Sequence, residues 1–77
     1  MVEAYAPFRS EFDRLEEQAR RAGDLQASDR PVVHMRTILV AEDETCFHLY
    51  EASSIEAIAE AMSAADIQAQ RIVEVTT

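Results

Sequence analysis

Residues 32–51 (VVHMRTILVAEDETCFHLYE) carry the strongest hydrophobic pattern in the chain. Two runs of β-branched and aromatic residues flank a short acidic segment, which predicts an antiparallel hairpin. Both faces of the first run are apolar, with Val33, Met35 and Leu39 on one side and Val32, Ile38 and Val40 on the other. Because apolar area is unfavourable in water, we expect helices to cover one face of this hairpin and a further partner to cover the other.

The segment before the hairpin predicts a strand and a helix. Residues 1–6 alternate as a short strand that Pro7 ends. Helical spacing begins at about Ser10, and Gly23 is placed to end the helix at C′. Residues 24–31 are polar and predict a loop. The apolar stripe of the helix consists of Phe8, Phe12, Leu15, Ala19 and Ala22.

The segment after the hairpin predicts a second helix and a last strand. Ser53 and Glu56 have the spacing of a capping box, which predicts that a helix begins here. Residues 65–70 predict a fraying helix end and a connector, and residues 71–75 (RIVEV) predict a strand. The buried stripe of this helix consists of Ile55, Ile58, Ala59, Met62 and Ala65.

The resulting order, β-α-β-β-α-β, predicts a ferredoxin-like α+β fold formed by residues 1–77 as a single domain. Right-handed crossovers place both helices on one face of a four-stranded antiparallel sheet. The opposite face then exposes a larger apolar patch than a monomer usually tolerates. We therefore expect a homodimer in which the two sheets pack against each other.

Composition and charge narrow the classes of function. The chain has a net charge of -8, with seven basic against fifteen acidic residues, so phosphates would repel it and nucleic acid is not an expected partner. No apolar run approaches the roughly 20 residues that cross a bilayer, and no leader resembles a secretory signal. The single cysteine, Cys46, cannot form an internal disulfide, which favours a reducing cytoplasm.

Most of the chain resembles a family of small domains of unknown function that includes a nickel-binding protein. In that family a strand leads into a "PEDE-x-C/F" turn, a helix starts at "EAPS" and a strand "RIVEA" closes the domain. The matching segments here are residues 41–46 (AEDETC), 51–54 (EASS) and 71–75 (RIVEV), and residues 2–7 (VEAYAP) are similar to the first strand of the family.

This resemblance implies a ferredoxin-like fold in a dimeric α+β barrel, and it raises the question of metal binding. The chain departs from the family pattern where proline is replaced, at Ala41 and at Ser53 or Ser54. The usual Gly-Leu-Pro before the last strand is replaced by residues 65–68 (ADIQ). No metal-ligand set can be matched residue by residue, so none is carried over.

The hairpin register decides which side chains share a face. A three-residue connector, Glu42 to Glu44, would place Ala41 opposite Thr45 and Leu39 opposite Phe47, which separates apolar from mixed residues. The apolar face, predicted to meet the helices, consists of Met35, Thr37, Leu39, Phe47 and Leu49. The mixed face, predicted to line the space between subunits together with Glu3 and Tyr5, consists of His34, Arg36, Ile38, Val40, Cys46, His48 and Tyr50.

Cys46 and His48 are the candidate metal ligands. They alternate along one strand, so they point the same way, and thiolate and imidazole suit Ni²⁺, copper or zinc. In the expected register His34 lies four pair positions from His48, about 13 Å away, so a third ligand would come from another strand or subunit. The alternative is a buried free cysteine beside a hydrogen-bonded histidine.

The space between the two sheets could also bind a small ligand through Tyr5, His34, Arg36 and Tyr50. We consider three functions: a dimeric domain that binds a divalent metal or small ligand, a cofactor-free monooxygenase- or isomerase-like enzyme, and a dimerisation module without a ligand. No nucleophile–base–orienter set is visible, so no catalytic residue is assigned. The acidic connector 42–44 lacks the ligand number of a calcium loop.

Overall fold

The computed structural model describes residues 1–7, 10–25 and 31–75. The elements follow in the predicted order: β1 (Val2–Tyr5), α1 (Phe12–Asp24), β2 (Val32–Val40), a 3₁₀ turn η1 (Ala41–Asp43), β3 (Thr45–Ala52), α2 (Ile55–Ala64) and β4 (Ala69–Ile72). The four strands form one antiparallel sheet in the order β2-β3-β1-β4. The ferredoxin-like α+β fold is thus confirmed. Phe8 and most of the expected loop at 24–31 lie outside the described residues.

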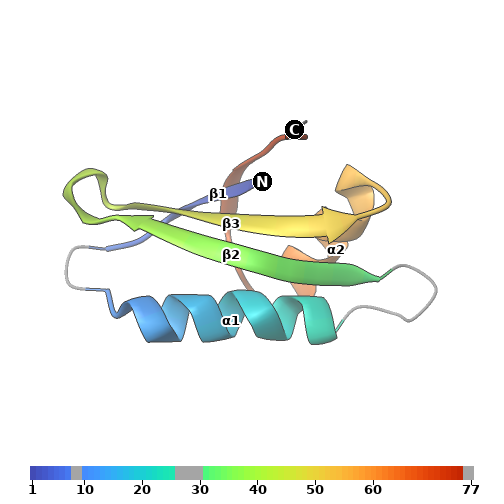
Figure 1. Cartoon of the computed structure of the whole chain (residues 1–77), viewed down its shortest axis with the longest axis horizontal. Helices are drawn as coiled ribbons and strands as arrows, with labels where there is room; N and C mark the ends of the chain where they lie inside the picture. The colour runs from blue at the N-terminus through green and yellow to red at the C-terminus, as the bar shows by residue number, and fades with distance from the viewer. Residues whose placement is uncertain (8–9, 26–30, 76–77) are drawn as a thin grey trace.

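Both helices cover the same face of the sheet, which we call the inner face. In Figure 1, α1 lies along the edge strand β2. α2 lies behind the open end of the β2–β3 hairpin, at the opposite end from the turn η1. The inner face is recognised by the burial of its strand residues, which are Val2, Ala4, Val32, Thr37, Cys46 and His48. The helices contribute Ala19 and Ala22 from α1, and Ala57, Ile58, Ala61 and Met62 from α2. These small and apolar side chains let the helices pack closely on the sheet.

The register of the hairpin differs from the prediction. Val40, not Ala41, lies opposite Thr45, so the connector is four residues long. Glu44 closes it in the left-handed conformation, with φ of 49°. This shift moves every side chain of β3 to the face opposite the predicted one, since alternate residues point to opposite sides. Phe47 and Leu49, expected under the helices, therefore lie on the other face of the sheet.

We call this other face the outer face. It contains many apolar side chains, although the residues opposite one another are mixed in character: Ile38 pairs with Phe47, Arg36 with Leu49, and Val33 with Glu51. The exposed fractions of Val33 and Ile38 are 54% and 42%. Met35, expected under the helices, is also exposed. The outer face of the hairpin is therefore largely apolar, whereas the inner face contains apolar residues together with Thr37 and His48.

α1 begins at Phe12 and continues through Gly23 to Asp24, so Gly23 does not end the helix as predicted. Gly23 has no positive φ. Its role is spatial: a Cβ at this position would lie 2.5 Å from the carbonyl oxygen of Val32. The glycine therefore lets the last turn of α1 lie directly against the backbone of β2. Neither helix in the described ranges has the length and hydrophobicity to cross a bilayer.

α2 has a defined cap at each end. The N-cap is Ser54 rather than Ser53, and its side chain accepts a hydrogen bond from the amide of Ala57. At the other end the amide of Asp66 donates to Ser63 O, and that of Ile67 donates to Met62 O. These two bonds form a Schellman motif, whose C′ residue adopts the left-handed conformation. The last strand begins at Ala69, two residues before its predicted start.

Asp66 occupies that C′ position with φ of 57°, a conformation that glycine adopts without steric cost. Replacing Asp66 with glycine should therefore stabilise the fold by about 0.5–1 kcal/mol. Urea unfolding measures the change. The matched control is Ala65→Gly at the neighbouring C-cap, where φ is -93° and glycine should lower stability. An Asp66→Gly variant no more stable than wild type would contradict the prediction.

Candidate functional site

The inner face contains an unusual group of buried polar side chains. Thr37 and His48 lie opposite each other on β2 and β3, with exposed fractions of 4% and 2%. Cys46 precedes His48 on the same face and is 1% exposed, with a free thiol. Polar groups are costly to bury unless they are hydrogen-bonded. These residues are therefore expected to be partners of one another.

Their hydrogen bonds form a continuous row. Cys46 Sγ lies 3.5 Å from His48 Nε2, and His48 Nδ1 lies 2.9 Å from Thr37 Oγ1. Thr37 Oγ1 lies 2.8 Å from His34 Nε2. We call these four residues the polar row. Within the described part of the chain, no buried polar side-chain atom lacks a hydrogen-bond partner.

A β-bulge in β2 brings His34 into this row. Residues three apart in a regular strand point to opposite faces, so His34 and Thr37 should not meet. Between His34 and Arg36 the pairing with β3 shifts, so that His34 lies opposite Tyr50 and Arg36 opposite Leu49. The extra residue restores the alternation, and both side chains then lie on the inner face. The His34 and His48 ring centroids are 6.3 Å apart, rather than the expected distance of about 13 Å.

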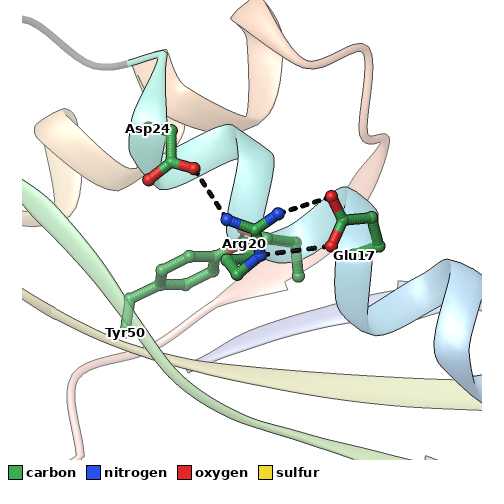
Figure 2. A network of polar contacts seen from close by, with 5 residues as sticks. Glu17, Arg20, Asp24 and Tyr50 are labelled. Atoms are coloured by element: carbon green, nitrogen blue, oxygen red, sulfur yellow. Dashed lines mark hydrogen bonds and ion pairs between the residues drawn. The ribbon is translucent and has the colours of Figure 1, made fainter.

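Tyr50 connects this region to α1. Its ring makes edge-to-face contacts with both histidines, with centroid distances of 5.5 Å to His34 and 6.4 Å to His48. Its hydroxyl donates a hydrogen bond of 2.6 Å to the carbonyl oxygen of Ala19. Figure 2 shows the Tyr50 ring extending from the sheet to α1 beside Arg20. The helix therefore covers the polar row and is tied to the sheet at this point.

Arg20 lies on the exposed side of α1 and forms ion pairs with Glu17 and Asp24 (Figure 2). These pairs are more than half exposed, so they contribute little to stability. Their relevance is electrostatic. Burial lowers the pKa of His34, nearby Glu16 opposes the shift, and Arg20 adds to it. Charges of both signs near His34 oppose each other, and burial keeps its ring neutral.

Burial also sets the protonation of the other groups. Burial, assisted by the neighbouring His34, lowers the pKa of His48 to about 4. Burial raises the pKa of the Cys46 thiol. Burial also raises the pKa of Tyr50, and the neighbouring Cys46 raises it further. At neutral pH the row therefore consists of a protonated thiol, a hydroxyl and two neutral imidazoles.

The other two candidate residues lie elsewhere. Arg36 lies on the outer face, opposite Leu49. Tyr5 also points away from the inner face; it is 56% exposed, and its hydroxyl donates to the Glu44 carboxylate at 2.9 Å. The predicted grouping of Tyr5, His34, Arg36 and Tyr50 in one cavity is therefore wrong. Cys46, His48, His34 and Tyr50 do share a face, but it is the helix-covered face and not the one predicted to line a space between subunits.

Thr37 was missed as a site residue because the predicted register placed it among apolar residues. The local sequence carried no signal for it, because residues three apart in a regular strand point to opposite faces, and only the bulge between His34 and Arg36 brings Thr37 to His34. The row also has the order of a nucleophile, a base and an orienting hydroxyl, which the sequence did not reveal. All three groups are buried, however. A substrate would have no approach to them without movement of α1.

Two hollows on the described surface lie away from the polar row. One lies between α1 and the end of α2, and its lining includes Arg14, Arg21 and Asp66. The other lies beside the end of α2 and is lined by residues such as Met62 and Ile67. No residue of the polar row lines either hollow.

The separation of the Cys46 sulfur and the His48 nitrogen matches that of two ligands on one metal ion. A sulfur at about 2.3 Å and a nitrogen at about 2.0 Å from one tetrahedral metal ion are about 3.5 Å apart. The observed separation of Sγ and Nε2 is 3.5 Å, so the pair fits as two ligands of one ion. His34 lies beyond the opposite nitrogen of His48. No group of three or more potential ligands occurs among the described residues.

Comparison with known proteins identifies the family. No curated protein and no solved structure matches the chain. A family model described as "Nickel responsive protein SCO4226-like" matches residues 1–75, nearly the whole chain. This agrees with the resemblance found in the sequence. The chain therefore belongs to the nickel-responsive SCO4226-like family.

Proposed function

We propose that this protein binds a divalent transition metal, Ni²⁺ in its biological setting, through Cys46 and His48. The observation that carries the proposal is the 3.5 Å separation of Cys46 Sγ and His48 Nε2 within a buried polar row. The description of the family as nickel-responsive favours Ni²⁺ over other metals. Thiolate and imidazole are soft and borderline ligands, which suit nickel, copper and zinc better than calcium or magnesium.

The protonation of the two groups suits a responsive site. Metal binding requires a thiolate and a neutral imidazole. His48 is already neutral at physiological pH, because burial lowers its pKa to about 4. Cys46 keeps its proton until a metal replaces it, because burial raises the pKa of the thiol. Binding would then release one proton and require α1 to move, which couples the metal to the packing of the helix on the sheet.

We also propose that two copies of the chain associate through their outer faces. This face contains the large apolar residues Ile38, Phe47 and Leu49, whereas polar residues lie on the inner face beneath the helices. Such an arrangement is unfavourable if the outer face remains in water. The ligand pair faces the helices in each copy, so each protomer would bind its own metal.

The charges on the outer face support a second copy as the occupant. Its described residues include two carboxylates, Glu3 and Glu51, and two guanidinium groups, Arg36 and Arg71. The strand residues of this face thus carry two charges of each sign, in a chain whose net charge is -8. Two copies approaching through other surfaces would repel each other, whereas here acidic and basic groups are balanced around an apolar centre.

Native mass spectrometry and thermal unfolding of tag-free protein test both proposals. We expect a dimer and one Ni²⁺ per protomer. Ni²⁺ at about 100 times its Kd should raise the Tm by about 10 °C or more. Cys46→Ala and His48→Gln should each abolish the nickel adduct and the shift in Tm. His34→Gln is the matched control, because this second histidine lies in the polar row but is not a proposed ligand.

Two results would contradict the metal proposal: wild-type protein that shows neither a nickel adduct nor a shift in Tm, or a Cys46→Ala variant that retains both. Loss of binding in His34→Gln with retention in His48→Gln would show that the ligand assignment is wrong. A stable monomer at high protein concentration would contradict the association of outer faces, whatever the result with nickel.

A further inference from the structure

The polar row has a direction, which follows from counting its protons. A neutral imidazole has one N–H, a threonine has one O–H and a thiol has one S–H. Each of the three hydrogen bonds between Cys46, His48, Thr37 and His34 uses one proton. If the thiol is the donor to His48, the only proton of a neutral His48 lies on Nδ1, and Thr37 Oγ1 is the acceptor in the bond with it.

The Cys46 end of the row supplies this information. The Cys46 thiol is 1% exposed, and its hydrogen-bond partner in the structure is His48 Nε2, 3.5 Å from Sγ. A buried S–H needs an acceptor, and an unprotonated imidazole nitrogen is one. The thiol therefore donates to His48 Nε2.

The bond between His48 and Thr37 is then determined. With Nε2 accepting from the thiol, the single proton of a neutral His48 lies on Nδ1, and Thr37 Oγ1 accepts it. The Thr37 hydroxyl then has its own proton available for His34 Nε2. We infer that Thr37 is a positioning residue, which fixes His48 as the Nδ1–H tautomer and directs the Nε2 lone pair toward Cys46.

The opposite direction is unfavourable at the Cys46 end of the row. With its proton on Nε2, His48 would be the donor, and the proton of a thiol that is 1% exposed would have no acceptor in the row. A buried donor without a partner is costly, so the row favours the thiol as the donor.

This inference deepens the proposed function and rests on it in one respect: the lone pair that accepts the thiol proton would be the one that binds the metal. Groups that orient a metal-binding histidine typically change affinity about 10–100-fold when they are removed. Thr37→Val, which keeps the shape but not the hydroxyl, should weaken nickel binding by such a factor. Thr37→Ser keeps the hydroxyl and should restore the affinity.

The test is made without metal, on ¹⁵N-labelled protein at neutral pH. Long-range ¹H–¹⁵N correlation spectra of the imidazole distinguish Nδ1–H from Nε2–H tautomers. We expect His48 to be Nδ1–H in wild type and in Thr37→Ser, and to lose this signature in Thr37→Val. The matched control is Thr45→Val, because the Thr45 hydroxyl donates to the backbone of Asp43 and lies outside the row.

A wild-type spectrum that shows His48 as Nε2–H, or as a mixture, would overturn the inference. An unchanged tautomer in Thr37→Val would overturn it as well. If Thr37→Val does not fold, the wild-type and Thr37→Ser spectra still decide it. The nickel titration of wild type is a separate measurement, so the predicted tautomers with no nickel binding would reject the proposed function and leave the role of Thr37 in place.

Discussion

Replacing Gly23 with alanine should destabilise the fold by about 2 kcal/mol or more, because the added methyl overpacks the contact between α1 and β2. In an ordinary helix the same substitution would stabilise by about 1 kcal/mol. Here the new Cβ would lie 2.5 Å from the carbonyl oxygen of Val32, a backbone atom that cannot rotate away. The last turn of α1 would have to move from the strand, next to the position where His34 enters the polar row.

Urea unfolding of Gly23→Ala measures this effect. The matched pair is Gln18→Ala and Gln18→Gly at an exposed position of the same helix, where alanine should be the more stable by about 1 kcal/mol. The order of alanine and glycine should thus be reversed at residue 23. A Gly23→Ala variant at least as stable as wild type would show that α1 does not approach β2 this closely.

The second large effect is a loss of stability in mild acid through His48. Its pKa is about 4 in the folded protein, where the ring is buried, and its ordinary value is 6.5. Between these values the unfolded chain binds a proton that the folded chain does not, so stability rises with pH in this window. Lowering the pH from 7 to 5 should remove about 2 kcal/mol through this residue. Below about pH 4 both states are protonated and the loss stops.

Comparison with His48→Gln isolates this contribution, since glutamine retains hydrogen-bonding groups but does not titrate. The free energy of unfolding of the wild type should fall more steeply than that of His48→Gln between about pH 7 and 5. Keeping the measurement above about pH 5 limits the contribution of the carboxylates, whose ordinary pKa values lie near 4. Equal pH dependence in the two proteins would mean that the imidazole is accessible to solvent in the folded state.

The order of strands and helices could be predicted from the chain alone. So could the fact that Cys46 and His48 lie on the same face of one strand. Repeats of two and of three to four residues mark strands and helices because they reflect how side chains leave the backbone. The same local rule places Cys46 and His48 on one face of a strand. The presence of apolar residues on both faces of the hairpin was also predictable, since it depends only on composition and alternation.

Which of these faces meets the helices depends on contacts between strands. One additional residue in the connector, Ala41, was enough to exchange the faces of β3, and no local pattern opposed the exchange because both faces contain apolar groups. Three further features join segments that are distant in the sequence or depend on how the strands pair. They are the bulge that brings His34 to Thr37, the close approach of Gly23 to β2, and the hydrogen bond from Tyr50 to α1. For this reason the residue pattern identified the candidate ligands, whereas their burial, their neighbours and the role of Thr37 followed from the packing of the folded chain.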